Sequence, residues 1–426
     1  MKANELIARL REGALKKYEN LYGDQVDFQT GRYIRAIEEF TALYGADRDV
    51  CLFSVPGRTE VCGNHTDHNH GRVLAAAIDR DVIAVAARSD EAVVRVRSEG
   101  YPEDRVALAE CEDPSKQTAF KSSALVAGMC GGFRRNGYAI GGFDAYTTSR
   151  VLKGSGLSSS AAFEVMVGNI LNHLYNNGKV PNEEIAKVAQ YAENVYFGKP
   201  CGLMDQMACA VGGFVYIDFQ DPKNPVIDPI DFSLTERGYR LCIVNTGGNH
   251  ANLNADYASV PQEMKSVAAA MGQEVLRGIT EEALVAKIPA LRGKVGDRAI
   301  LRALHFIREN ERVATVAAAL KEGRTADFLA GICASGDSSF KYLQNVYTTL
   351  NVEEQGLSLA LAVTEGALAG KDCAWRVHGG GFAGTIQVFV KQELAADFCR
   401  LQDSIFGKDA AMLLSIRPAG AIEIKL

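Results

Sequence analysis

The feature that most constrains this chain is a short run of glycines and serines directly before a helical pattern. Two glycines let the backbone approach a ligand closely, and the serines supply hydroxyl groups. The helix that follows directs its free N–H groups and the positive end of its dipole to the same point. We therefore expect an anion-binding loop, with phosphate as its ligand; the alternative is a polar turn before an ordinary helix. The run comprises Gly154, Ser155, Gly156, Leu157, Ser158, Ser159, Ser160 and Ala161.

Length and composition indicate a large globular protein of two or more domains. The chain has 426 residues, of which 47% are hydrophobic, enough for a sizeable core. Its formal net charge of −6 gives no bulk attraction for nucleic acid or for an anionic membrane. Residues 1–13 lack the pattern of a secretory signal, and no segment approaches 18 apolar residues. Ten cysteines without a CxxC pair are typical of reduced thiols in a cytoplasmic protein.

Apolar periodicity predicts a mixed α/β first half and a largely helical region further along the chain. Helices are expected at residues 4–22, at 33–44 and directly after Ala161, and strands at 50–55, 73–88, 93–96 and 241–245. The turn-forming segment 221–225 leads us to place a domain boundary near residue 232. Helical spacing dominates 262–370, and a strand at 385–390, a helix at 393–407 and further strand material within 411–426 follow.

A polar segment from Pro56 to Gly71 stands out within this apolar half. It contains Arg58 and the sequence Asn64-His65-Thr66-Asp67-His68-Asn69-His70, whose donors and acceptors suit a polyhydroxylated ligand. Because His65, Asp67, His68 and His70 are possible metal ligands, a metal site is one alternative, but neighbouring loop positions rarely converge on one ion. A polar loop whose hydrogen bonds are satisfied internally is the other.

An acidic pair forms the next candidate site. Glu193 follows a helical pattern, and Asp205 lies in an apolar neighbourhood within Cys201-Gly202-Leu203-Met204-Asp205-Gln206. A carboxylate there must be paired or hydrogen-bonded, and it is suited to act as a base or as a charge partner. The alternative is a buried structural aspartate that caps a helix.

A glycine-rich segment near the C-terminus matches GxGxxG formally but precedes a strand. The dinucleotide fingerprint requires a strand, the glycines and then a helix, so Gly379–Thr385 does not indicate a Rossmann site. The chain also has no Walker A motif and no HRD or DFG motif. If it transfers phosphate, it is neither a P-loop NTPase nor a protein kinase.

Taken in order, these four segments resemble the GHMP kinase superfamily and, within it, the galactokinase family, with weaker similarity at Tyr257 and Arg302–Arg312. The resemblance runs from about residue 30 to the end. It implies an α+β, two-lobed GHMP kinase fold, with a mixed-sheet N-terminal lobe like domain 2 of ribosomal protein S5 and a ferredoxin-like C-terminal lobe. The implied division is an N-terminal helical extension at 1–28, an N-terminal domain at 29–232 with the sugar and ATP loops, and a C-terminal domain at 233–426.

The resemblance also implies the reaction and the site: ATP-dependent phosphorylation of a hexose at its anomeric hydroxyl, with Mg²⁺. Asp205 would accept or orient the sugar proton, and Arg58 would stabilise charge and keep Asp205 ionised. Ser160 and Glu193 would hold Mg²⁺. The expected sugar contacts are Asn64, His65, Thr66, Asp67, Gly202 and Tyr257. The expected nucleotide contacts are Ser98, Gly154, Ser155, Gly156, Leu157, Ser158, Ser159 and Ser160.

One departure from the family pattern bears on the substrate. The family usually has Glu where this chain has Asn64, and an uncharged amide would repel a 6-carboxylate less. Galactose is the expected substrate, and galacturonate, N-acetylgalactosamine and arabinose are alternatives. A non-catalytic sugar and ATP sensor is the alternative from another class, but it should have lost part of the catalytic set. The expected partners are small molecules only, and the chain is expected to be a cytoplasmic monomer.

Overall fold

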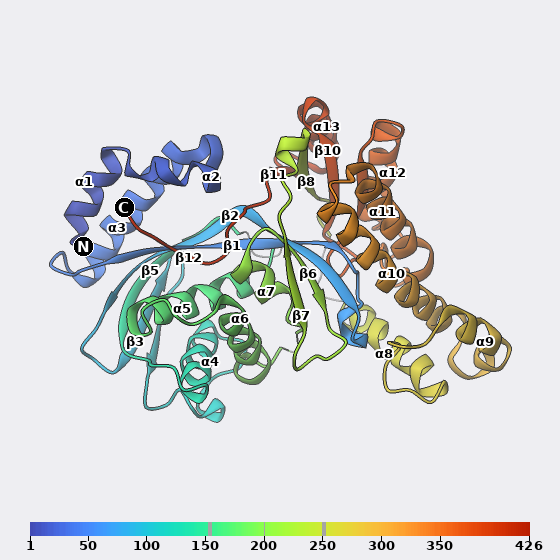
Figure 1. Ribbon diagram of the computed structural model, residues 1–426, viewed down its shortest axis with the longest axis horizontal. Helices are drawn as coiled ribbons and strands as arrows, with labels where there is room; N and C mark the ends of the chain where they lie inside the picture. Colours follow the sequence, from blue (N-terminus) through green and yellow to red (C-terminus); the bar gives the residue numbers. More distant parts are fainter. Residues whose placement is uncertain (152–155, 200, 249–252) are drawn as a thin grey trace.

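The computed structural model describes residues 1–151, 156–199, 201–248 and 253–426, and it has two lobes joined by a long β-hairpin (Figure 1). The hairpin consists of β1 (Cys51–Cys62) and β2 (Arg72–Arg88). It starts beneath the N-terminal helices and ends among the helices of the C-terminal lobe. Its closing turn, residues 63–71, therefore lies against the C-terminal lobe.

The N-terminal segment forms several short helices where the sequence predicted one. They are α1 (Ala3–Arg11), η1 (Ala14–Tyr18), α2 (Glu19–Tyr22) and η2 (Gly23–Gln25), followed by α3 (Val26–Tyr44). The expected helix 4–22 is interrupted at Gly13, whose φ of 86° is a left-handed conformation that glycine adopts readily. The break lets Leu6, Leu10 and Leu15 all reach one apolar cluster against β1 and β2.

Within the described residues, the first sheet has eight strands in the order β12-β1-β2-β5-β3-β4, with β6 paired to β2 and β7 paired to β6. The β3–β5 pair is parallel and the other pairs are antiparallel. The α1–α3 segment covers one face, and α4 to α7 cover the other (Figure 1). The remaining bounds are β3 (Val93–Ser98), β4 (Glu103–Ala107), β5 (Phe143–Ser149), β6 (Phe214–Asp218), β7 (Val226–Ile230), β12 (Ile422–Ile424), α4 (Ser122–Arg135), α5 (Ser159–Tyr175), α6 (Asn182–Tyr191) and α7 (Met204–Val211).

Strand β1 extends further than the sequence predicted. The sequence predicted a strand at residues 50–55 only, but residues 56–62 continue it through two register irregularities, at Pro56/Arg58 and at Glu60/Cys62. The partner strand offers three consecutive alanines, residues 75–77, opposite Arg58, Thr59 and Glu60. Because small partners leave room for long polar side chains, Arg58 and Glu60 are held on a rigid strand, and only residues 63–71 form the turn.

The C-terminal lobe has a four-stranded antiparallel sheet in the order β11-β8-β10-β9, covered by helices. Its elements are β8 (Tyr239–Asn245), α8 (Asn254–Ala270), α9 (Glu281–Val295), α10 (Asp297–Lys321), α11 (Thr325–Ser338), η7 (Ser339–Leu343), α12 (Gly356–Leu368), β9 (Ala374–His378), β10 (Thr385–Lys391), α13 (Gln392–Phe406) and β11 (Ala411–Leu414). These elements agree with the expected helical region and with the strand and helix after it.

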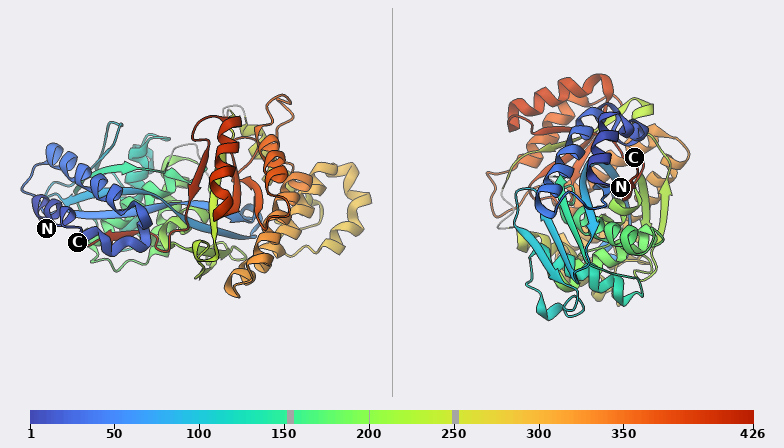
Figure 2. Two further views of the ribbon diagram at one scale, coloured as in Figure 1. Left: turned by 90° about the horizontal axis from the view of Figure 1, so that it is seen from above. Right: turned by 90° about the vertical axis from the view of Figure 1, so that its left-hand side faces the viewer.

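After β11 the chain returns to the first lobe. Strand β12 pairs with β1, so both termini lie at the same end of the molecule (Figure 2). The boundary near residue 232 stays a prediction, and the structure adds that residues 422–424 belong to the sheet of the first lobe. None of the helices in the described part of the chain is long and apolar enough to cross a membrane.

Candidate active site

The two predicted catalytic residues form a bidentate ion pair. Arg58 projects from β1, and Asp205 lies in the first turn of α7. Arg58 Nε donates to Asp205 Oδ1 at 2.7 Å, and the Arg58 Nη2 group donates to Oδ2 at 2.7 Å. Ser158 Oγ donates to the same Oδ2, and the Arg58 Nη1 group donates to the Gly156 carbonyl. The serine-rich loop, the strand and the helix thus meet at one carboxylate.

These contacts set the ionisation of Asp205. Burial alone would raise the pKa of the carboxyl group, but the charge and hydrogen bonds of Arg58, together with the Ser158 hydroxyl, lower it below its usual value. The side chain of Asp205 still keeps 32% of its exposure, whereas that of Arg58 keeps 9%. Asp205 is therefore an ionised carboxylate at neutral pH that a ligand can reach.

The serine-rich loop is held against β1 through its backbone. The Arg58 N–H donates to the Leu157 carbonyl at 3.1 Å, and a Cβ on Gly57 would lie 2.7 Å from the same oxygen. Ser158 then takes the left-handed conformation, with a φ of 60°, before α5 begins at Ser159. Gly154 and Ser155 lie outside the described residues, so the anion-binding role of this loop stays a prediction. The predicted helix after the loop is confirmed.

The two predicted metal ligands lie next to each other. Ser160 Oγ donates to Glu193 Oε1 at 3.3 Å, and Lys199 Nζ lies 3.0 Å from the same oxygen. Gln206 Nε2 donates to Glu193 Oε2 at 2.7 Å and to Glu164 Oε2 at 3.2 Å. The sequence reasoning assigned no role to Glu164, although it lies one helical turn after Ser160, a spacing that places two side chains on one helix face.

The donor set fits a magnesium ion. Burial and the charge of Glu193 raise the pKa of Glu164 well above its usual value, and Glu164 Oε1 is buried with no partner among the described residues. Carboxylate and hydroxyl oxygens are the hard ligands that Mg²⁺ prefers. Among the described residues, no group of three or more His, Cys, Asp or Glu side chains is arranged to hold a metal ion, at residues 65–70 or elsewhere.

The turn between β1 and β2 encloses a small cavity of about 130 Å³ near the catalytic pair. It is lined by Glu60, Gly63, Asn64, His65, Asp67, His68, Val73, Met204 and Gly380. Gly202 adjoins this cavity, since a Cβ on it would lie 2.3 Å from Asp67 Oδ2. His65 Nε2 lies 3.0 Å from the Gly380 carbonyl, and burial lowers the pKa of His65 to about 4. Four of the predicted sugar contacts therefore gather here.

Three other predicted residues have contacts of a different kind. The Thr66 hydroxyl is buried and donates to the carbonyls of Gly63 and Arg72, which closes the turn. The Tyr257 hydroxyl donates to the Gly381 carbonyl at 3.0 Å. Ser98 ends β3, and its hydroxyl accepts a hydrogen bond from a threonine on β5 at 2.9 Å. Direct ligand contacts of these three side chains stay predictions.

Helix α10 contacts the backbone of the turn. The carbonyl of Asn64 is 2.9 Å from His305 Nε2, and the N–H of Gly63 donates to Glu309 Oε1 at 3.0 Å. Burial lowers the pKa of His305, so this ring is neutral near pH 7 and can donate from one nitrogen. The only sequence signal for these supports was the weak similarity at Arg302–Arg312.

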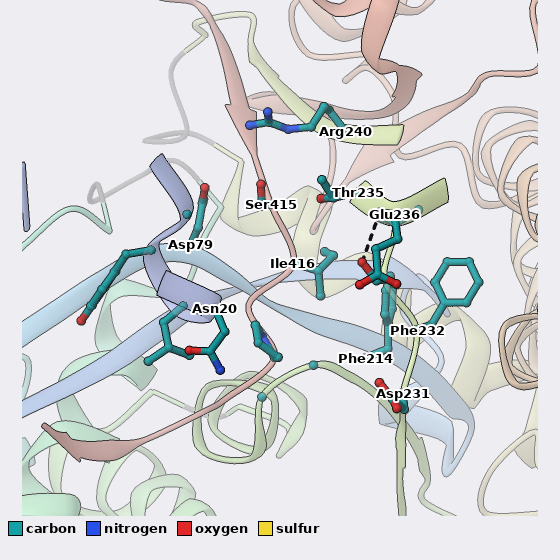
Figure 3. Close-up of a pocket in the computed structure, with 18 of the residues that line it drawn as sticks. Asn20, Asp79, Phe214, Asp231, Phe232, Thr235, Glu236, Arg240, Ser415 and Ile416 are labelled. Carbon is teal, nitrogen blue, oxygen red and sulfur yellow. Dashed lines mark hydrogen bonds between the residues drawn. The ribbon is translucent and has the colours of Figure 1, made fainter. Parts of the chain in front are cut away.

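A larger cavity, of about 970 Å³, lies elsewhere. None of the predicted site residues lines it. It is formed by residues 19–25, 211–214 and 229–236 together with Asp79, Arg80, Arg240, Leu413, Ser415, Ile416 and Pro418. Figure 3 shows Asp79, Arg240 and Glu236 on its walls. The candidate site is therefore identified by its charges and hydrogen bonds and not by its size.

Comparison with known families assigns the class of the protein. Residues 124–213 match the model of the GHMP kinases N terminal domain, and residues 38–88 match the galactokinase galactose-binding signature. The structure resembles that of Lactococcus lactis galactokinase complexed with galactose, with a TM-score of 0.77, 25% identity, and coverage of 91% of this chain and 98% of that one. Methanococcus jannaschii mevalonate kinase, at 14% identity and a TM-score of 0.61, shares the fold. The protein is a GHMP kinase.

Curated relatives show which family of GHMP kinases the chain belongs to. The chain is 32% identical to a galactokinase of Streptomyces coelicolor, over 83% of this chain and 88% of that protein. It is 30% identical to a galactokinase of Actinobacillus pleuropneumoniae, again over 83% and 88%. The chain belongs to the galactokinase family, and it is a sugar kinase that uses ATP. The predicted family, fold class and enzyme type are confirmed.

Proposed function

We propose that this protein transfers the γ-phosphoryl group of ATP to the anomeric hydroxyl of galactose, giving galactose 1-phosphate and ADP with Mg²⁺. The observation that supports this most directly is the position of the Arg58–Asp205 pair. The pair contacts the serine-rich loop through Gly156 and Ser158. The sugar cavity lies beside it, since Met204 lines that cavity and directly precedes Asp205. A donor phosphate and an acceptor hydroxyl can therefore meet at one carboxylate.

In this proposal Asp205 accepts the proton of the anomeric hydroxyl as its oxygen attacks the γ-phosphorus. Arg58 keeps Asp205 ionised and contributes positive charge where negative charge develops on the transferred group. Phosphoryl transfer depends on positioning and charge stabilisation more than on covalent help from the protein. Two side chains already fixed by hydrogen bonds to each other meet that requirement.

Ser160 and Glu193 would hold the magnesium ion, with the unpartnered Glu164 oxygen close by. When bound, the ion would neutralise charge on the ATP phosphates. Lys199 is the cation that contacts Glu193 in the structure, and its side chain is 57% exposed. Such an exposed ammonium group can move away from Glu193 at little cost.

One of the alternative substrates loses support. The case for galacturonate depended on the missing charge at Asn64, but Glu60 Oε1 lies 2.9 Å from the Asn64 amide and Glu60 lines the same cavity. The cavity wall therefore still contains a carboxylate. The sensor alternative is also disfavoured, because Arg58, Ser160, Glu193 and Asp205 are all present and in contact with their expected partners.

The test is ADP release with ATP and Mg²⁺ on a panel of galactose, galacturonate, N-acetylgalactosamine, arabinose, glucose and mevalonate. The highest kcat/KM is expected for galactose, and phosphorus NMR of the product should show an anomeric phosphate. A higher kcat/KM for another sugar would overturn the substrate assignment. Sugar binding without any turnover would overturn the catalytic proposal and favour the sensor.

A further inference from the structure

The sugar cavity contains a carboxylate that the family comparison does not account for. Glu60 lies on β1 and is 7% exposed, and it lines the cavity. Its Oε1 accepts hydrogen bonds from the Asn64 amide at 2.9 Å and from Arg376 at 3.2 Å. Its Oε2 accepts no hydrogen bond from any described residue. The same oxygen is absent from the set of fully buried side-chain atoms without a hydrogen-bond partner. One oxygen of a carboxylate that lines the cavity is thus without a hydrogen bond from the described residues.

Asn64, by contrast, has little capacity left for a ligand. Its two amide hydrogens go to Glu60 Oε1 and to the Gly379 carbonyl at 2.7 Å. Its Oδ1 accepts from the Asn345 amide at 2.7 Å, and Ser339 Oγ lies 3.4 Å away. A primary amide has two donor hydrogens and one oxygen with two acceptor positions, so this inventory is filled. The side chain is also fully buried.

The position of Glu60 is fixed before any ligand arrives. Arg376, which is itself buried, donates to the Val61 carbonyl at 2.9 Å as well as to Glu60. The Glu60 carbonyl accepts a hydrogen bond from Gln387 at 3.0 Å. A side chain held by neighbours in this way presents its free oxygen in one direction, which is the condition for selective recognition.

We infer that Glu60, and not Asn64, is the specificity-determining residue at this end of the sugar site. Its free carboxylate oxygen accepts a hydrogen bond from a sugar hydroxyl and repels a carboxylate at the same place. Asp67 adds a second acidic side chain to the cavity wall. Burial raises the pKa of Glu60, and the charges of Arg376 and Arg58 oppose that rise and favour the carboxylate. His65 is neutral near pH 7, because burial lowers its pKa to about 4, so it adds no positive charge here. The inference rests on the proposed function, and it names the residue that makes the site selective for a neutral sugar.

The decisive measurement is the ratio of kcat/KM for galacturonate to that for galactose. In Glu60→Gln the acceptor becomes a neutral amide of equal size. The kcat/KM for galactose should fall about tenfold or more, mainly through KM, while the ratio rises about tenfold or more because the repulsion is gone. A purely structural role would lower the active fraction of enzyme equally for both sugars and leave the ratio unchanged. An unchanged ratio would overturn the inference.

A second variant separates the charge from the contact. Glu60→Asp keeps the carboxylate and its pairing with Arg376 but withdraws the free oxygen by one methylene. It should raise the KM for galactose several-fold and still exclude galacturonate; a KM equal to that of the wild type would contradict the contact. The wild-type measurement keeps the two proposals apart. If wild-type enzyme does not turn over galactose, both fail, whereas activity on galactose with an unchanged ratio in Glu60→Gln removes only the role of Glu60.

Discussion

Replacing Asp205 by asparagine tests the centre of the proposed mechanism. Asparagine has almost the same shape but has no charge and cannot accept a proton at neutral pH. In the structure, Arg58 donates to both carboxylate oxygens at 2.7 Å, and Ser158 donates to one of them. The amide of asparagine offers only one oxygen, so at least one charged hydrogen bond from Arg58 is lost while the outline of the site is kept.

The structure sets different magnitudes for stability and for rate. A lost hydrogen bond to a charged group costs about 1.5–3 kcal/mol when it is buried. Because about a third of the Asp205 side chain is exposed, at 32%, water can replace part of that bond, and we expect about 1 kcal/mol. A proton acceptor that acts in the transition state contributes about 10²–10⁴-fold, which corresponds to roughly 3–5 kcal/mol of barrier. The rate should therefore fall far more than the stability.

The assay is steady-state ADP release on galactose at saturating ATP and Mg²⁺, together with thermal unfolding. Asp205→Asn should lower kcat by at least about a hundredfold, with KM for ATP close to that of the wild type and a melting temperature only slightly lower. Arg58→Lys is the matched control for the charge, since it keeps a cation but loses the bidentate geometry. A kcat of Asp205→Asn within about threefold of the wild type, in a folded protein, would refute the role of Asp205.

Three further predictions concern the neighbouring groups. Ser160→Ala removes one of two adjacent oxygens, and the Mg²⁺ concentration for half-maximal activity should rise about tenfold. Gly202→Ala adds a Cβ that would lie 2.3 Å from Asp67 Oδ2, so KM for the sugar should rise about tenfold and KM for ATP should stay unchanged. The ring of His378, at the end of β9, lies 3.0 Å from the Thr59 hydroxyl on β1. Its pKa is lowered to about 3 by burial and by the charge of Arg58, so its stabilising contribution is complete well above the unfolded pKa of about 6.5 and is lost as the pH falls. The stability difference between wild type and His378→Gln should shrink by about 2 kcal/mol from pH 6.5 to 5, as urea titrations would measure.

Each of these predictions has a result that contradicts it. An unchanged Mg²⁺ requirement in Ser160→Ala would show that the serine is not a ligand. A rise in KM for ATP equal to that for the sugar would show that Gly202→Ala disturbs the whole site. A stability difference that is constant between pH 6.5 and 5 would mean that His378 is not held neutral in the folded protein.

The sequence by itself determined the family and most of the helices and strands. These features depend on residue type and on spacing over a few positions, as in the apolar stripe of α5. Local spacing gave a wrong prediction where the backbone conformation of one residue, Gly13, ends a helix. The stripe of residues 4–22 continued across Gly13, and only the packing of Leu6, Leu10 and Leu15 against the sheet shows why the helix must break there.

The tertiary structure decided how the site residues are used. Arg58 and Asp205 are 147 positions apart, and Glu60 and Arg376 are 316 apart, so no local pattern shows that each pair is in contact. The sequence drew attention to Asn64 because it departs from the family, but the folded chain fills every hydrogen-bonding position of that amide and leaves an oxygen of Glu60 free. Each side chain has a limited number of donor hydrogens and acceptor positions, and these bond only at short distance. The polar groups that remain available to a ligand are therefore decided only when the two lobes come together.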